Sequence, residues 1–135
     1  MRGFMKYVQS KTIEGGSTIT QQVVKNLIVG GEISLERKIK EMITAVRLEK
    51  TLSKDEILEV YLNLIFLGRG SWGIQMATES YFGKEKIVTD LELNEATFLA
   101  GLTHSPSQYE PERSLENIGE RQQYVLKRMI DEGFI

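Results

Sequence analysis

Residues Gly15–Asn26 read GGSTITQQVVKN, and this stretch decides how the first part of the chain folds. Its two leading glycines interrupt any preceding helix and permit a sharp turn. Thr18, followed three residues later by Gln21, fits a capping box, and Ser17 is an equally plausible N-cap. We therefore predict a helix over residues 18–28. Its N-terminus, with unpaired N–H groups and a positive dipole end, suits an anion.

The predicted helix carries an apolar side and polar sides. The apolar side consists of Ile19, Val23, Val24 and Leu27. Gln21 lies one turn before Lys25 on another side, and the same spacing separates Gln22 from Asn26. These polar side chains indicate either a site for an anionic, oxygen-rich ligand or the solvated face of a well-capped surface helix.

The composition is that of an ordinary globular chain. Its 135 residues, 41% hydrophobic and 27% charged, suffice for one domain with a core of its own. The net charge of −2 gives no general attraction to nucleic acid. The chain has no cysteine and a single histidine, which excludes disulfides, thiolate sites and histidine-rich metal sites. No apolar run approaches the ~20 residues of a membrane span, and the first residues do not form a signal peptide.

Helical periodicity dominates the chain and strand-like alternation is scarce, so we predict an all-α fold. Ser34 can cap one further helix, and Ser53 forms a capping box with Glu56 at the start of the next. The predicted helices cover residues 4–11, 18–28, 34 to about 50, 53 to the glycines at 68 and 70, 72–82, 92–102 and 114–132. The helix from residue 34 has an apolar stripe formed by Ile39, Met42, Ile43 and Val46. On the helix from residue 53, the residues expected to pack inward are Ile57, Leu58, Tyr61, Leu62 and Ile65.

The order of charges in Arg37–Glu49, RKIKEMITAVRLE, is unusual for a surface helix. Arg37, Lys38 and Glu41 fall within one turn on one face. A base that precedes an acid by four residues is the weaker arrangement, and cations in a first turn oppose the helix dipole. A site for a diphosphate explains this order better than helix stability does. The alternative is a solvated charged face, since exposed ion pairs are common and weak.

Residues 57–77, ILEVYLNLIFLGRGSWGIQMA, are mainly core. Tyr61 and Asn63 are the polar exceptions within this stretch. We predict that they form a satisfied, buried hydrogen-bond pair rather than a ligand site.

Four motifs follow one another along the chain: GGSTITQQVVKN, RKIKEMITAVRLEK, KDEILEVYLNLIFLG and HSPSQYEP. In order and spacing they resemble the glycosyltransferase domain of class A penicillin-binding proteins and of monofunctional peptidoglycan transglycosylases. The resemblance runs from about Arg2 to the C-terminus and includes the closing MIDEGFI. It implies that residues 1–135 form one such domain, beginning just before the second motif. It also implies a mostly helical, lysozyme-like fold with part of a smaller jaw lobe.

The resemblance further implies a reaction, the polymerisation of lipid II into glycan strands. In the family, a glutamate of the first motif deprotonates the 4-hydroxyl of the acceptor sugar. That oxygen attacks the anomeric carbon of the donor and expels undecaprenyl diphosphate with inversion. This chemistry needs a base on one side and stabilisation of the diphosphate charge on the other.

The resemblance assigns the site residues of this chain. Glu41 matches the family's second essential glutamate and is implied to be catalytic, holding the diphosphate directly or through a divalent cation such as Mg²⁺. No cofactor is expected to be built in. The residues implied to bind the donor sugar and its phosphates are Ser17, Thr18, Gln21, Gln22, Lys25, Arg37 and Lys38.

Two departures from the family pattern stand out. The first motif, Glu-Asp-x-x-Phe-x-x-His, has no counterpart, and nothing in MRGFMKYVQSK resembles it. We therefore expect a domain without its N-terminal helix, membrane anchor and general base, which is weak or inactive alone. Glu14 is the nearest upstream carboxylate, but nothing matches it to that base. Ile33 stands where relatives usually carry a phosphate-contacting arginine, so donor binding should be weakened.

The partners implied by the resemblance are lipid II, the growing glycan strand, moenomycin-type inhibitors and the membrane surface, on the outer face of the cell membrane. Nucleic acid is not expected. Apolar surface uncovered by the absent helix predicts self-association. A rival hypothesis is a non-catalytic helical module that binds lipid-linked diphosphate or a cell-wall protein partner. A lysozyme-type hydrolase ranks last, because the sequence offers no clear acid outside the Arg37–Glu41 turn.

Overall fold

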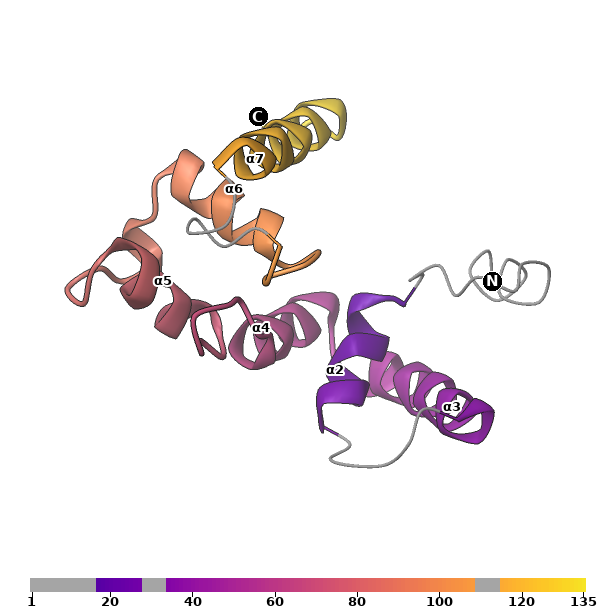
Figure 1. The fold of residues 1–135 in the computed structure, drawn as a ribbon. Helices are drawn as coiled ribbons and strands as arrows, with labels where there is room; N and C mark the ends of the chain where they lie inside the picture. Colours follow the sequence, from indigo (N-terminus) through magenta and orange to yellow (C-terminus); the bar gives the residue numbers. More distant parts are fainter. Residues whose placement is uncertain (1–16, 28–33, 109–114) are drawn as a thin grey trace. The chain divides into compact units, whose positions relative to one another are not determined.

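The computed structural model describes residues 17–27, 34–108 and 115–135 of the chain. Helices dominate these ranges, as Figure 1 shows, and the predicted all-α fold is confirmed. The elements are α2 (Ile19–Leu27), α3 (Leu35–Thr51), α4 (Lys54–Leu64), α5 (Ile74–Phe82), the 3-10 turn η1 (Val88–Asp90), α6 (Leu93–Leu102) and α7 (Leu115–Asp131). The predicted helix over 4–11, and the predictions for Glu14 and Ile33, lie outside the described residues.

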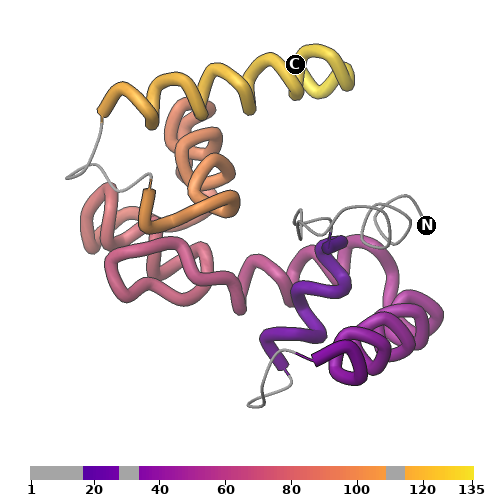
Figure 2. The backbone as a smooth tube through the Cα atoms, turned by 45° about the vertical axis from the view of Figure 1, so that its right-hand side comes forward, coloured from indigo at the N-terminus to yellow at the C-terminus, as the bar shows by residue number. Residues whose placement is uncertain are grey.

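The chain divides into two compact units, Met1–Tyr61 and Leu62–Ile135, and the boundary between them falls within α4. In the first unit, α2 packs against α3 (Figure 2). In the second unit, α6 packs against α7, and α5 contacts both α6 and η1. None of the helices in the described ranges combines the length and the apolar character needed to cross a bilayer.

Side-chain caps start the helices of the first unit where the sequence predicts them. At α2, Thr18 Oγ1 accepts the Gln21 N–H at 3.1 Å while Gln21 Oε1 accepts the Thr18 N–H at 3.2 Å. This reciprocal pair is a capping box, so the threonine is the N-cap. Ser34 Oγ caps α3. Ser53 and Glu56 form the predicted capping box of α4.

Only part of the apolar side of α2 is buried. Val23 and Val24 are buried, and Thr20 is buried with them. Ile19 and Leu27 are exposed. Both lie at the ends of a nine-residue helix, where less of the neighbouring helix is within reach.

The predicted apolar stripe of α3 faces solvent. Ile39, Ile43 and Val46 are 47, 49 and 53% exposed, and α3 buries Glu41 and Ala45 instead. The apolar stripe is therefore not the side of α3 that packs inward. The side of α3 that packs inward carries Glu41, and hydrogen bonds from two partly exposed cations offset the cost of burying this carboxylate.

Helix α4 ends at Leu64, before the glycines predicted to end it. A hydrogen bond joins the two ends of the following turn, in which the Ile65 carbonyl oxygen accepts the Gly73 N–H at 2.8 Å. Gly73 has φ +86°, and a Cβ added there would lie 2.8 Å from the Asn63 carbonyl oxygen. A residue with this backbone cannot continue a helix, so α5 begins at Ile74 and not at residue 72.

The buried face of α4 is mostly the predicted one, but one of the two polar residues predicted to be buried is exposed. Ile57, Tyr61 and Ile65 are buried, while Leu58 is exposed. Asn63 is exposed as well, so the prediction that it is buried together with Tyr61 is wrong.

The core of the second unit is small and well defined. Its fully buried larger side chains are Leu67, Thr78, Thr97, Leu99 and Leu102. Ile118 brings α7 into this core. Glycines with positive φ follow α5 and α7, at Gly83 and near the C-terminus at Gly133, as the sequence predicts.

Candidate functional site

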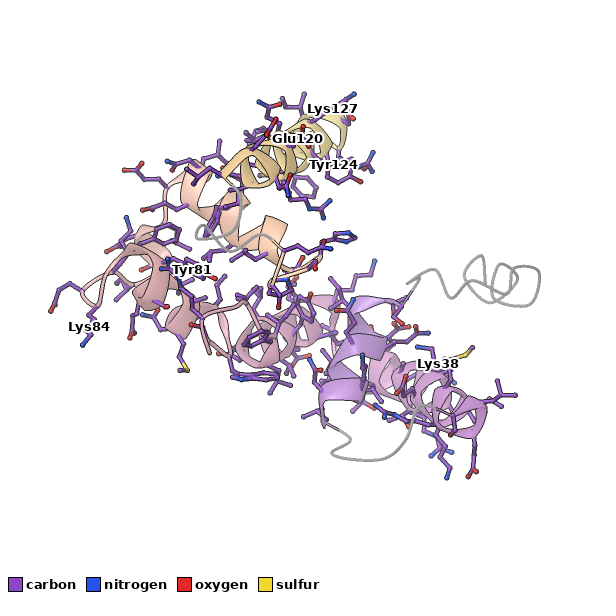
Figure 3. All side chains as sticks on the ribbon, viewed as in Figure 1. Lys38, Tyr81, Lys84, Glu120, Tyr124 and Lys127 are labelled. Carbon is purple, nitrogen blue, oxygen red and sulfur yellow. The ribbon has the colours of Figure 1, made fainter. Side chains whose placement is uncertain are left out.

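One turn of α3 and the residue that precedes the α2 cap form a cluster of charged and polar side chains, here called the charged cluster: Ser17, Arg37, Lys38 and Glu41. Glu41 is 4% exposed. Its Oε1 accepts the Arg37 Nε–H at 3.0 Å, and its Oε2 accepts from Lys38 Nζ at 3.3 Å. Lys38 Nζ also donates to Ser17 Oγ at 2.9 Å. Lys38 is labelled on α3 in Figure 3.

The charged cluster holds two cations on one buried carboxylate and therefore carries a net charge of +1. A buried carboxylate without partners would be costly, so the two bonds to Glu41 keep both cations in place. The side chains of Arg37 and Lys38 remain 21 and 36% exposed. Each can therefore meet an anion from solvent while it still touches Glu41.

The opposite side of the same helix shows what an ordinary surface pair looks like. Lys40 Nζ lies 2.7 Å from Glu36 Oε1, and both side chains are more than two-thirds exposed, at 69 and 77%. The hydrogen bond from Lys40, and then its charge, lower the pKa of the Glu36 carboxyl. This pair follows the favourable acid-before-base order, whereas Arg37 and Glu41 reverse it.

Among the predicted site residues in α2 and just before it, one contacts the charged cluster and the others do not. Ser17 reaches Lys38. Thr18 and Gln21 cap α2 through each other. Lys25 is exposed, and within the described ranges it has no hydrogen bond or ion pair to the charged cluster.

Gln22 is held by Tyr61, a residue from a different helix. The buried Tyr61 hydroxyl donates to Gln22 Oε1 at 3.5 Å, which links α4 to α2. Tyr61 was recognisable as a polar group in an apolar stretch, but a partner 39 residues away leaves no local signal.

A second contact between α2 and α3 was missed. The buried Thr20 donates from Oγ1 to Glu49 Oε1 at 2.7 Å. Thr20 lies three and four residues before Val23 and Val24, so it shares their side of the helix. A hydroxyl on this apolar side was the feature of the sequence from which the contact could have been predicted. The contact joins the C-terminal part of α3 to α2 and supports the frame of the charged cluster.

The residues present do not fit a resident metal ion. No group of three or more His, Cys, Asp or Glu side chains in the described ranges could hold one. Glu41 is the one carboxylate of the charged cluster, and both of its oxygens already accept from cations. A divalent ion at this carboxylate would compete with Arg37 and Lys38 for the lone pairs of Glu41.

Comparison with known proteins identifies relatives over almost the whole chain. Residues 1–130 match the family described as Transglycosylase. Penicillin-binding protein 1A of Escherichia coli is 48% identical over 122 residues, which are 90% of this chain and 14% of that protein. Penicillin-binding protein 1A of Aquifex aeolicus is 46% identical over 131 residues, 97% of this chain and 18% of that protein.

A solved structure agrees with these sequence matches. The crystal structure of penicillin-binding protein 1A from Haemophilus influenzae superposes with a TM-score of 0.57 at 33% identity, over 92% of this chain and 15% of that chain. The chain thus spans less than a fifth of the length of the relatives it matches. The family match and the helical architecture together show that the chain belongs to the transglycosylase family.

Proposed function

We propose that this chain is a peptidoglycan glycosyltransferase domain that binds the diphosphate of lipid II at the charged cluster. One observation carries the proposal: Glu41 holds Arg37 and Lys38 side by side on one turn of α3, and Lys38 reaches Ser17 beside the α2 cap. A diphosphate offers several anionic oxygens in a row. Two adjacent cations and a hydroxyl match that pattern of acceptors.

The proposed chemistry assigns each member of the charged cluster a task. In the proposed step the acceptor 4-hydroxyl gives its proton to a general base, to which no residue of the given sequence is matched, and its oxygen attacks the anomeric carbon of the donor. The bond from that carbon to the diphosphate breaks, and the diphosphate oxygen takes the electron pair and gains negative charge. Arg37 and Lys38 donate hydrogen bonds to this leaving group, and such preorganised donors stabilise the transition state. Glu41 contributes by fixing the two cations before the substrate arrives.

The remaining α2 residues are proposed to contact the donor from the other side of the diphosphate. Gln22, whose carboxamide oxygen is held by Tyr61, has its NH₂ group left for a sugar hydroxyl. Gln21 is proposed to contribute in the same way. Lys25 has a flexible four-carbon stem and is proposed to turn toward a bound phosphate.

The proposed partners follow from the proposed reaction. Lipid II and the growing strand would be met at the outer face of the cell membrane, and moenomycin-type phosphoglycolipids would compete for the charged cluster. The exposed stripe of α3 around Ile39, Ile43 and Val46 is proposed as the surface through which copies of the chain associate. Light scattering that shows a strict monomer at high concentration would refute the association.

Isothermal titration tests the diphosphate site with farnesyl diphosphate and moenomycin as ligands. Replacing Lys38 by alanine should weaken binding by tenfold or more, since a charge-assisted hydrogen bond contributes about 1.5–3 kcal/mol. Lys25→Ala should weaken it as well, and Ile33→Arg should strengthen it. Lys40→Ala is the matched control, because Lys40 lies on the same helix in an exposed pair. Equal affinities of wild type, Lys38→Ala and Lys40→Ala would place the ligand elsewhere.

A further inference from the structure

A hydrogen bond outside the charged cluster joins α2 to the C-terminal part of α3. Thr20 Oγ1 donates to Glu49 Oε1 at 2.7 Å, and Thr20 is 6% exposed. The proposed reaction assigns a task to neither residue. Hydrogen bonds to a charged acceptor are stronger than those between neutral groups, so this contact is suited to hold the two helices in one arrangement.

The Thr20 hydroxyl lies on the apolar side of α2. Val23 and Val24, on the same side, are 0 and 2% exposed. Burying a hydroxyl beside such side chains costs free energy unless it is hydrogen-bonded, so α2 is favoured in the position where Glu49 accepts from it. Valine has nearly the same shape as threonine. Packing alone therefore does not require a hydroxyl at this position.

Helix α3 contacts the start of α2 through two of its long polar side chains. Lys38 Nζ donates to Ser17 Oγ at 2.9 Å, and Glu49 accepts from Thr20. Lys38 and Glu49 are about 16 Å apart along α3, at about 1.5 Å per residue, whereas Ser17 and Thr20 lie within four consecutive residues. The two side chains therefore reach the start of α2 from opposite ends of α3, the helix against which α2 packs (Figure 2).

We propose that Thr20 and Glu49 are positioning residues of the charged cluster. Their hydrogen bond fixes the start of α2 on α3 and so keeps the Ser17 hydroxyl beside the Lys38 ammonium. Without it, α2 can turn slightly on α3, and the hydroxyl and the ammonium lose their alignment, to which hydrogen bonds are sensitive. The effect on the ligand rests on the proposed function, since it is the diphosphate that these groups would receive.

Isothermal titration of the 135-residue chain with farnesyl diphosphate measures the effect on binding. Thr20→Val keeps the shape of the side chain but removes the donor. We expect it to weaken binding by about three- to tenfold, the size of the net contribution of one hydrogen bond. Thr20→Ser keeps the donor and should recover most of this loss. Glu49→Gln keeps an acceptor oxygen and should weaken binding less than Glu49→Ala does.

A comparison of affinity with stability separates positioning from a general effect on the fold. Ile57→Val removes a methylene from the core of the first unit, so it should lower the melting temperature and leave the affinity unchanged. Thr20→Val should change the melting temperature less, because the exposed Glu49 regains water as its partner. Affinities that fall in both variants in proportion to the loss of stability would overturn the inference.

Nitrogen-15 NMR of the lysine ammonium groups tests the positioning without a ligand. In Thr20→Val the Lys38 Nζ signal should move toward its position in Ser17→Ala, which lacks the hydroxyl that Lys38 bonds. The signal of Lys40, which belongs to an exposed pair on the same helix, should not move. An unmoved Lys38 signal, or an affinity for farnesyl diphosphate that Thr20→Val leaves unchanged, would overturn the inference. A Lys38 signal that moves as expected in a chain that binds no farnesyl diphosphate would refute the proposed function and leave the positioning of Lys38 in place.

Discussion

Glu41 is a buried carboxylate that fixes the positions of two neighbouring cations. It accepts from Arg37 and Lys38 through different oxygens, so each cation has a fixed position. The sequence predicted this grouping because three residues within one helical turn must share a face. It could not predict the bond from Lys38 to Ser17, since the two residues are 21 positions apart and only the packing of α2 on α3 brings them together.

We predict that Glu41→Gln lowers the free energy of unfolding by about 1–3 kcal/mol, because the side chain keeps its shape but loses its negative charge and one of its two acceptor oxygens. Urea denaturation followed by circular dichroism measures the change. Glu36→Gln removes a carboxylate from an exposed pair on the same helix and should have little effect. If both variants unfold at the same denaturant concentration, the contacts of Glu41 do not stabilise the fold.

Gly73 provides a second prediction at the level of one residue. Gly73→Ala should destabilise the chain by more than about 1 kcal/mol, because its φ is +86° and the new Cβ would meet the Asn63 carbonyl oxygen at 2.8 Å. Gly119→Ala is the opposite case, since it lies within α7 and a Cβ there meets nothing within 4 Å. That change should stabilise by about 0.5–1 kcal/mol. Thermal unfolding that ranks the two variants in reverse order would contradict the structure of the turn.

At the level of elements, helix starts were predictable and buried faces were less so. The caps at Thr18, Ser34 and Ser53 depend on residues a few positions apart, which a sequence displays directly. The packing of α3 depends on what lies beside it. Its apolar stripe through Ile43 has the periodicity of a helix but is exposed. The face that packs inward carries Glu41, whose charge is balanced by neighbouring cations.

The start of α6 yields a prediction about pH. A backbone N–H of Glu92, and then the hydrogen bond from Lys86, lower the pKa of Glu95. A lowered carboxyl pKa gives stability that is present above the unfolded-state pKa and lost as pH falls through the folded-state pKa. The melting temperature should therefore fall less between about pH 7 and about pH 3 in Glu95→Gln than in the wild type.

The exposed Glu120 of α7 offers a control for that experiment. Glu120→Gln should preserve the wild-type pH dependence. The same bond to Glu95 raises the pKa of Lys86, so its contribution is present at neutral pH and is lost only as pH rises through that raised value. An equal acid-induced fall in wild type and Glu95→Gln would mean that this contact has no part in acid stability.

For the molecule as a whole, the family and the fold class were both accessible from sequence, because ordered motifs and helical periodicity extend over most of the chain. The place of the boundary between the two units was not predicted, since it falls inside α4, a helix whose sequence shows no break at Tyr61. A cavity near Arg69, in the second unit, was also not predicted. Its lining comes from residues between positions 69 and 122, which no local pattern connects.

We predict that the purified 135-residue chain does not polymerise lipid II by itself. None of its residues matches the first-motif glutamate that serves as general base in the family, and removing a general base costs ~10²–10⁴-fold in rate. A gel assay of glycan strands measures the activity. Strands formed at rates near those of full-length relatives would contradict the prediction, and Glu14 would be the first carboxylate to replace.

The central claim is that the charged cluster receives the phosphate of a lipid-linked ligand. A crystal structure of the chain with a moenomycin-type phosphoglycolipid tests it most directly. We expect phosphate oxygens within about 3 Å of Lys38 Nζ and the Arg37 guanidinium, the distance of charge-assisted hydrogen bonds, with Glu41 still touching both cations. A phosphate bound at another surface, with Arg37 and Lys38 unchanged in their contacts, would contradict the account.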